Sequence, residues 1–326
     1  MHRRFALLPL LTLAAASATL VSAGGARAAA SAARPKPAQH AAADSASERR
    51  QVQTYWTERR MEAAQPLEAP GPRQGARPGQ GAPWTAPPTG ARAEPQAARS
   101  SGAAPTGGGA VARTTGRIFF TTQGRNASCS GTAVTSANES VVLTAGHCVK
   151  LNGAFHTNWV FVPGYAAGNR PFGTWPATRL LTTQQWSSSE DANFDVAAAV
   201  VAPLEGRTLV GTVGGQGVAF NQQRRQQMYA FGYPAVAPYD GSKLIHCGGR
   251  AFDDFLLTDD HGLTCDMTGG SSGGPWLLNF NESTGLGTQN SVNSFKYNFA
   301  PNWMFGPYFG NDAQSLYQAA QSTNAL

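Results

Sequence analysis

Two serines lie among four glycines at residues 269–274, inside the stretch CDMTGGSSGGPW. Gly/Ser-rich segments are commonly flexible linkers, but Cys265 before this stretch and Trp276 after it are core-type residues. Glycine permits φ > 0 and close backbone approach, so a tight loop of this composition can direct several main-chain N–H groups at one oxygen. A serine in such a loop is a candidate nucleophile if the chain also supplies a base.

A candidate base and a carboxylate to orient it stand upstream of the serines. His147 lies in VVLTAGHCVK, where an apolar β-branched strand runs into Ala-Gly. A histidine held at a strand end can work as a general base. The orienting carboxylate must be partly buried, and NFDVAAAVV places Asp195 at the mouth of an apolar strand. Asp191 is the alternative, but the polar run SSSEDAN around it predicts a solvated side chain.

Short strands must position these residues. From Thr114 onward the chain alternates short apolar runs, such as RIFFTT, SVVLTA, WVFVP and VAAAVVA, with Gly, Asn, Ser and Pro. This spacing predicts an all-β barrel or sandwich. Residues 311–324 have the pattern of a closing helix, with Leu316 and Tyr317 on one side. The roughly 213 residues suit two six-stranded barrels or one large sandwich.

The N-terminal third differs in composition. Residues 1–28 have the layout of a secretory signal peptide: basic residues, a short apolar run and then small residues. Residues 29–113 are rich in Ala, Pro, Arg, Gln and Gly, which predicts a largely disordered pro-segment or tether. Within it, residues 47–64 have helix-forming composition, with Ser47 as a candidate cap. No later stretch is apolar enough to span a membrane, so we expect a secreted, soluble protein.

The formal charge of +6 does not indicate a nucleic-acid partner. The balance of Lys and Arg over Asp and Glu is +8 in residues 1–113 and −2 in residues 114–326. The basic character therefore belongs to the leader, and the predicted folded part lacks a basic footprint for nucleic acid.

All four cysteines lie in the part predicted to fold: Cys129, Cys148, Cys247 and Cys265. An even number in a secreted chain predicts two disulfides, with three pairings open. A zinc site is the alternative, but the spacings contain no CxxC pair.

Three motifs in order resemble those of the chymotrypsin-like serine peptidases over residues 114–326: TAGHC with His147, DVA with Asp195, and GxSGGP with Ser272. Among these peptidases the chain is most similar to the secreted bacterial glutamyl-endopeptidase-like branch. The resemblance implies two antiparallel six-stranded β-barrels with a short C-terminal helix, preceded by the largely disordered region. It also implies that Ser272 attacks the substrate carbonyl, His147 takes its proton and Asp195 orients the imidazole. The N–H groups of Gly270 and Ser272 would then bind the oxyanion.

The resemblance further implies the bridges Cys129–Cys148 and Cys247–Cys265, and no metal or cofactor. Ser271 stands where animal digestive relatives carry an aspartate that pairs with a freshly cleaved N-terminus. Latency is therefore expected to come from the pro-segment, which would cover the cleft as an intramolecular inhibitor of a zymogen.

The residue preference at the scissile bond has two interpretations. Asp266 lies six residues before Ser272, the offset at which trypsin-type members keep a carboxylate for substrate Arg or Lys. With Met267 as a wall of the same pocket, this favours cleavage after basic residues. The alternative is a glutamyl-specific endopeptidase in which Lys296 binds the substrate carboxylate. Asn293 stands where glutamyl endopeptidases carry a pocket histidine.

Two other classes of function are weighed against a peptidase. A catalytically inactive binding protein is expected to have lost a motif residue, and none is missing. An α/β-hydrolase esterase needs the order Ser, Asp, His and strand–helix alternation, and neither is present. The sequence therefore predicts a secreted, monomeric serine endopeptidase that acts on proteins or peptides, with no nucleic-acid partner and no membrane association after signal cleavage.

Overall fold

The computed structural model describes residues 36–90 and 109–325, together with His2. The predicted signal peptide at 1–28 lies outside this part, apart from His2. Among the described residues no helix is long and apolar enough to cross a membrane.

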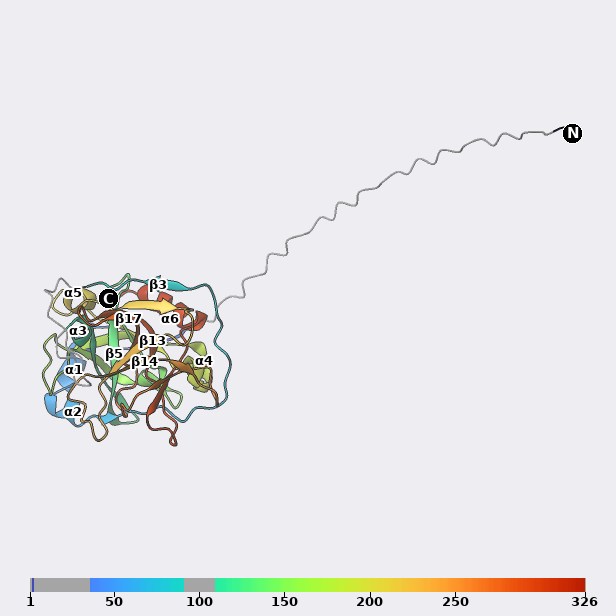
Figure 1. The fold of residues 1–326 in the computed structure, drawn as a ribbon. Helices are drawn as coiled ribbons and strands as arrows, with labels where there is room; N and C mark the ends of the chain where they lie inside the picture. Colours follow the sequence, from blue (N-terminus) through green and yellow to red (C-terminus); the bar gives the residue numbers. More distant parts are fainter. Residues whose placement is uncertain (1, 3–35, 91–108, 326) are drawn as a thin grey trace. The chain divides into compact units, whose positions relative to one another are not determined.

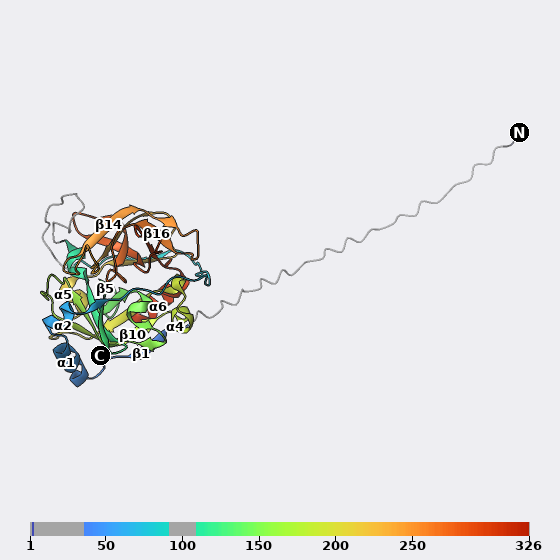
Figure 2. The same cartoon turned by 90° about the horizontal axis from the view of Figure 1, so that it is seen from below.

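Six strands close into the first barrel. One of them, β5, is labelled in Figure 1, and β5 and β10 are labelled in Figure 2. They are β4 (Thr115–Thr122), β5 (Arg125–Val134), β6 (Val141–Thr144), β9 (Thr157–Pro163), β10 (Trp175–Thr182) and β11 (Ala197–Val201). The ring runs β10-β11-β6-β5-β4-β9, and β9 pairs back with β10. Every pair in the ring is antiparallel. β6 and β11 pair with each other and are buried at every position, which agrees with their nearly continuous apolar sequences.

The C-terminal half contains a second six-stranded sheet. Its strands are β3 (Trp84–Ala86), β12 (Gly217–Phe220), β13 (Gln227–Gly232), β14 (Ile245–Arg250), β17 (Pro275–Asn281) and β18 (Leu286–Val292). Their order is β14-β13-β17-β18-β12-β3, and β12 pairs with β18 in parallel, which departs from a purely antiparallel barrel. A three-stranded sheet completes this half, with β15 (Phe252–Asp253), β16 (His261–Thr264) and β19 (Trp303–Gly306). Figure 2 shows β14 and β16 on one side of the molecule and β5 and β10 on the other.

Short helices and one hairpin connect the strands. They are β7 (Lys150–Leu151), β8 (Ala154–Phe155), α3 (Ala110–Thr114), α4 (Gln184–Ser189), α5 (Leu209–Val213), α6 (Asn311–Gln321) and the 3₁₀ turns η1 (Gly146–Cys148) and η2 (Ala192–Phe194). The predicted C-terminal helix is α6, which buries Leu316 and Tyr317 in the core of the first barrel.

Residues 36–90, called the N-terminal segment below, are ordered further than their composition predicts. They form β1 (Ala38–Ala41), α1 (Ala46–Tyr55), α2 (Glu58–Glu62), β2 (Gln65–Pro66) and the strand β3. The predicted helix at 47–64 is therefore two helices separated by Trp56 and Thr57. Ser45, not Ser47, caps α1, through a capping box with Glu48.

The N-terminal segment is held in place by pairing with strands of both halves of the molecule and by packing against buried side chains of the rest of the chain. β1 pairs with β10, β2 with β5, and β3 with β12, so its main chain finds hydrogen-bond partners on three strands. Val52, Trp56 and Met61 are buried in one cluster with Phe119 of β4. The composition of a segment indicates whether that segment can form a hydrophobic core of its own. The N-terminal segment instead buries its apolar side chains against the rest of the chain.

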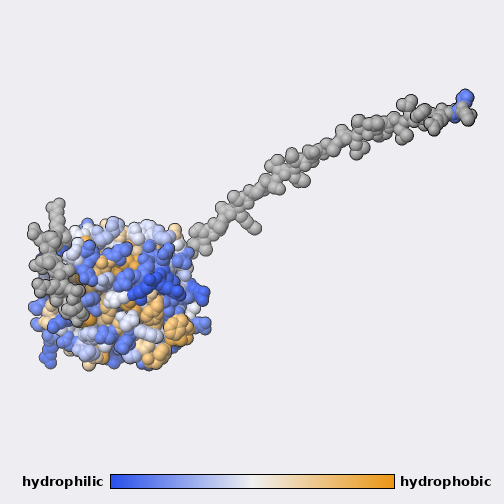
Figure 3. Space-filling model, in the orientation of Figure 1, coloured by the Kyte–Doolittle hydropathy of each residue, from blue (hydrophilic) through white to orange (hydrophobic). Residues whose placement is uncertain are grey.

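The surface of the described residues exposes few large apolar side chains. They are Val236, Phe255, Leu256, Leu257 and Phe299. On the face drawn in Figure 3, apolar areas alternate with polar ones.

Candidate active site

Strand pairing brings His147 and Asp195 together across 48 residues of sequence. β6 leads into the η1 turn that carries His147, Asp195 precedes β11, and Thr144 pairs with Ala197. The imidazole Nδ1 lies 2.8 Å from Asp195 Oδ2, and the His147 main-chain N–H donates to Oδ1 at 2.8 Å. Neither side chain is exposed. The carboxylate thus fixes both the ring and the backbone of the histidine.

Ser294 is a member of this network that the sequence did not single out. It follows β18 in the other half of the molecule, and its Oγ donates to Asp195 Oδ2 at 2.5 Å. In the sequence, its neighbours Asn293 and Lys296 are predicted to act only in substrate specificity. Asp195 therefore receives three hydrogen bonds in a buried site, which stabilise its charge.

His156 supports the same turn from behind. Its Nε2 donates to the His147 carbonyl at 2.9 Å. Burial lowers the pKa of His156 to about 4, so this imidazole is neutral at pH 7. It holds the backbone of the turn without placing a second positive charge beside His147.

The glycine-rich loop leaves two main-chain N–H groups without an acceptor in the described part of the chain. The Gly269 carbonyl accepts a hydrogen bond from Ala235 N–H at 2.7 Å, so the N–H of Gly270 on the same planar peptide points the opposite way. Gly270 has φ of +94°, and a Cβ there would lie 2.9 Å from the Tyr233 carbonyl oxygen, so only glycine fits. Across the described ranges, the N–H groups of Gly270 and Ser272 have no hydrogen-bond acceptor.

Ser272 lies at this loop, and its Oγ donates to the main-chain carbonyl of Leu67 at 3.3 Å. Leu67 belongs to the N-terminal segment. The Nε2 of His147 is buried and has no hydrogen-bond partner among the described residues. Cys148, which directly follows His147, has its Sγ 3.7 Å from the Ser272 carbonyl oxygen, so the serine lies beside the turn that carries the histidine. The serine hydroxyl, however, donates to the N-terminal segment.

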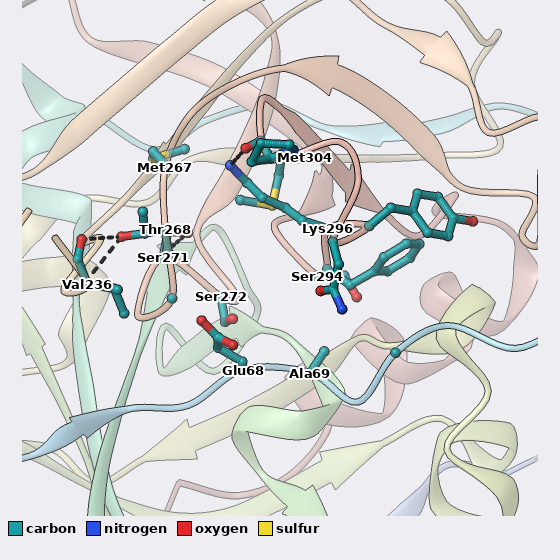
Figure 4. A pocket seen from close by; sticks show the side chains of 16 residues that line it. Glu68, Ala69, Val236, Met267, Thr268, Ser271, Ser272, Ser294, Lys296 and Met304 are labelled. Atoms are coloured by element: carbon teal, nitrogen blue, oxygen red, sulfur yellow. Dashed lines mark hydrogen bonds between the residues drawn. The ribbon is translucent and has the colours of Figure 1, made fainter. Parts of the chain in front are cut away.

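A cavity of about 420 Å³ opens beside Ser272 (Figure 4). It is lined by Glu68, Ala69, Gly71, Val236, Met267, Thr268, Gly269, Ser271, Ser272, Ser294, Phe295, Lys296, Tyr297, Asn298, Pro301 and Met304. Lys296 Nζ donates to the carbonyls of Cys265 and Pro301. Burial lowers the pKa of Lys296 to about 8, although the nearby Asp266 carboxylate acts in the opposite direction.

Of the four residues predicted to bind substrate, Met267 and Lys296 line the cavity and Asp266 and Asn293 do not. Burial alternates along 265–267, with Cys265 and Met267 buried, so Asp266 lies on the opposite, exposed face of the chain. Asn293 is buried, and its amide is used by the Phe231 and Ser271 carbonyls and by the indole of Trp276. The predicted preference for substrate Arg or Lys therefore has no Asp266 carboxylate in the cavity to support it.

Both expected disulfides are present, Cys129–Cys148 and Cys247–Cys265. The first ties β5 to the turn that carries His147. Cys129, His147 and Cys148 also form the one cluster of metal-ligand side chains in the described residues. Because the two sulfurs are bonded to each other, they offer no thiolate, and this cluster does not form a metal-ligand set.

Comparisons with known proteins were made by sequence and by structure. No family model matches the chain. A curated relative, an extracellular metalloprotease of Bacillus subtilis, is 26% identical over 156 residues, which is 48% of this chain and 47% of that protein, so the match spans about half of the relative's length. A solved Glu endopeptidase, 16% identical with a TM-score of 0.53, shares the fold.

Two solved structures are more similar. The protease Anisep from Arthrobacter nicotinovorans is 44% identical with a TM-score of 0.62, covering 65% of this chain and 96% of that one. The thermostable serine protease AL20 from an extremophilic microorganism is 44% identical with a TM-score of 0.63, covering 66% of this chain and all of that one. The chain is therefore a peptidase and belongs to the chymotrypsin-like serine proteases.

Proposed function

We propose that this chain is a secreted serine endopeptidase that acts through Ser272, His147 and Asp195. The observation that carries the proposal is the buried pair of His147 and Asp195, completed by Ser294, beside a serine loop in which the N–H groups of Gly270 and Ser272 have no acceptor among the described residues. With the N-terminal segment displaced, the Ser272 hydroxyl is free to donate to His147 Nε2. His147 then takes the proton as Ser272 attacks, and returns it to the leaving nitrogen.

Gly270 and Ser272 supply the donors for the oxyanion. Their N–H groups are oriented before substrate binds, so they need no rearrangement when negative charge develops on the carbonyl oxygen. Each such donor stabilises the transition state by about 3 kcal/mol in comparable enzymes. Asp195 holds the imidazole in the tautomer that accepts at Nε2 and stabilises the imidazolium that forms.

For the residue before the scissile bond, the cavity favours glutamate over arginine or lysine. The glutamyl-specific alternative is thus the better supported of the two predicted preferences. Lys296 is the one cationic group in the described lining of the cavity. The lining residues that belong to 114–326 include no carboxylate. A substrate glutamate would pack its methylene groups on Met267 and Met304 and bring its charge toward Lys296. A substrate arginine would instead leave two cations together in a partly buried site.

Secretion and latency complete the proposal. The layout of residues 1–28 supports export by a signal peptide. Residues 29–113 are then a pro-segment, and the N-terminal segment within it inhibits in cis because the Leu67 carbonyl accepts the hydrogen bond of the Ser272 hydroxyl. Residues 114–326 are the peptidase domain, which acts as a monomer on protein or peptide substrates.

The test combines an active-site probe with a substrate panel. After the N-terminal segment is removed by limited proteolysis, a fluorophosphonate probe is expected to label the wild type and not Ser272→Ala. No labelling would favour an inactive binding protein. On peptides that differ only in the residue before the scissile bond, we expect Glu to exceed Gln, Arg and Lys, and Lys296→Met to remove the margin of Glu over Gln. A preference for Arg or Lys that disappears in Asp266→Ser would contradict the assignment.

A further inference from the structure

The N-terminal segment enters the cleft on the His147 side of the nucleophile. β2 pairs with β5 in parallel, Gln65 with Ala127 and Pro66 with Ser128. The N–H of Leu67 donates to the Ser128 carbonyl at 3.0 Å. Ser128 precedes Cys129, whose disulfide partner directly follows His147. Residues 65–67 therefore lie beside the base.

The N-terminal segment leaves the cleft on the cavity side. Glu68, Ala69 and Gly71 line the cavity, and Figure 4 shows Glu68 and Ala69 next to Ser272. Further along, the N–H of Ala76 donates to Asp191 Oδ2 at 2.8 Å. From its N-terminal to its C-terminal end, the segment thus passes from the His147 side, over Ser272, to the cavity.

The chemistry of the proposed function requires the opposite direction in a substrate. The acyl part of a peptide bond belongs to the residue on its N-terminal side, and the leaving nitrogen to the residue on its C-terminal side. His147 must reach the leaving nitrogen to protonate it. A cleavable chain therefore places its N-terminal part in the cavity and its C-terminal part beside His147.

We propose that the N-terminal segment inhibits the peptidase by lying in its cleft in the reverse chain direction, as a ligand that cannot be a substrate. This inference rests on the proposed function, because the substrate direction follows from the role of His147. A strand of reversed direction fills the same groove and satisfies its polar groups, but no peptide bond is presented with its leaving nitrogen toward the base.

The contact at the nucleophile agrees with an unproductive complex. The Leu67 carbonyl oxygen accepts from Ser272 Oγ and not from the N–H groups of Gly270 and Ser272, where an oxyanion would be stabilised. The Ser272 hydroxyl donates its hydrogen bond to the Leu67 carbonyl and therefore makes none to His147 Nε2. Both halves of the catalytic step, activation of the nucleophile and polarisation of the carbonyl, are missing from this complex.

The reverse direction has a consequence for maturation. The bonds that cross Ser272 resist self-cleavage whatever residue stands at position 67. Release of the N-terminal segment therefore requires a cut outside residues 65–71, or displacement of the segment as a whole.

A direct test of chain direction uses engineered disulfides and needs no activity. In the full chain with Ser272→Ala, the pair Gln65→Cys and Ala127→Cys is expected to crosslink, because these two positions are register partners. The matched pair Ala69→Cys and Ala127→Cys is expected not to crosslink, because residue 69 lies at the cavity. Efficient crosslinking of the second pair and not the first would overturn the proposal.

A second test asks whether the N-terminal segment is cut in cis. Leu67→Glu, Leu67→Arg and Leu67→Phe are made in the full chain, which is incubated and mapped by mass spectrometry against a Ser272→Ala background. We expect no Ser272-dependent cut between residues 65 and 71 in any variant. A free peptide of residues 61–74 with the same substitution can bind in either direction, and the released enzyme is expected to cut at least one of the three.

The outcomes separate the two proposals. A concentration-independent cut at residues 66–69 of the full chain contradicts reverse threading. A released enzyme that neither labels with the fluorophosphonate probe nor cuts any peptide contradicts the proposed function, while the crosslinking result still decides the direction of the segment.

Discussion

Trp56 is the largest side chain that the N-terminal segment buries against the peptidase, and its removal should release the cleft. The indole is 1% exposed and packs on Phe119, with ring centroids 5.5 Å apart. Its Nε1 donates to the Asn158 carbonyl. When the segment undocks, all these contacts are lost and the indole enters water, so Trp56→Ala acts mainly on the docking equilibrium.

The size of the effect follows from that burial. Replacing a buried Trp by Ala costs about 3–5 kcal/mol, and each 1.4 kcal/mol changes an equilibrium about tenfold. The released fraction of the full chain should therefore rise by about two to three and a half orders of magnitude. Because the probe reaches Ser272 only in the released form, the rate of labelling should rise by the same factor, up to the rate of an enzyme without the N-terminal segment.

The assay follows fluorophosphonate labelling of the full chain over time, with Arg59→Ala as the control. Arg59 lies on α2 of the same segment, is exposed and makes no side-chain hydrogen bond or ion pair within the described part of the chain. It should label as slowly as the wild type. Met61→Ala, at a second buried anchor, should also accelerate labelling if Trp56→Ala does not fold. Equal rates for folded Trp56→Ala, Met61→Ala and Arg59→Ala would refute the reasoning.

Three further predictions concern the catalytic and substrate sites. Ser294→Ala removes a charge-assisted hydrogen bond from Asp195, worth about 1.5–3 kcal/mol, so kcat/KM of the released enzyme should fall about 10- to 100-fold with KM little changed. Ser291→Ala, which removes a buried serine hydroxyl that does not touch Asp195, should not reproduce the fall. Because the pKa of Lys296 is lowered to about 8, its ammonium is charged below that pH; preference for Glu over Gln substrates should decline as pH rises through about 8, and a flat ratio in Lys296→Met is the check. A chain that begins near Thr114, if it folds, should cleave peptides with no activation step, and strict dependence on a processing protease would contradict this.

The sequence predicted those parts of the site that sit in local motifs. The apolar strand before His147, the apolar strand after Asp195 and the glycine loop at Ser272 each have a signature within about ten residues. The cysteine count predicted two disulfides, and the resemblance supplied the pairing that the structure contains.

The positions of two other side chains, Asp266 and Ser294, could not be predicted from the sequence. Asp266 has the expected offset from Ser272, but alternation from the buried Cys265 places it outside the cavity. Ser294 has no local signature, because its partner Asp195 lies 99 residues away on another strand.

By itself, the sequence determined the strand-rich fold and the order of the chemically active residues, because periodicity and glycine placement are local properties of the chain. Only the tertiary structure decided what the N-terminal segment does. The segment is rich in Ala, Pro and Gly and cannot form a hydrophobic core of its own. In the structure, however, β1, β2 and β3 pair with three strands of the rest of the chain, and Trp56 packs on Phe119. Those partners are set by the folded surface of the rest of the chain, and the direction in which the segment crosses Ser272 is set by which edge its strands join.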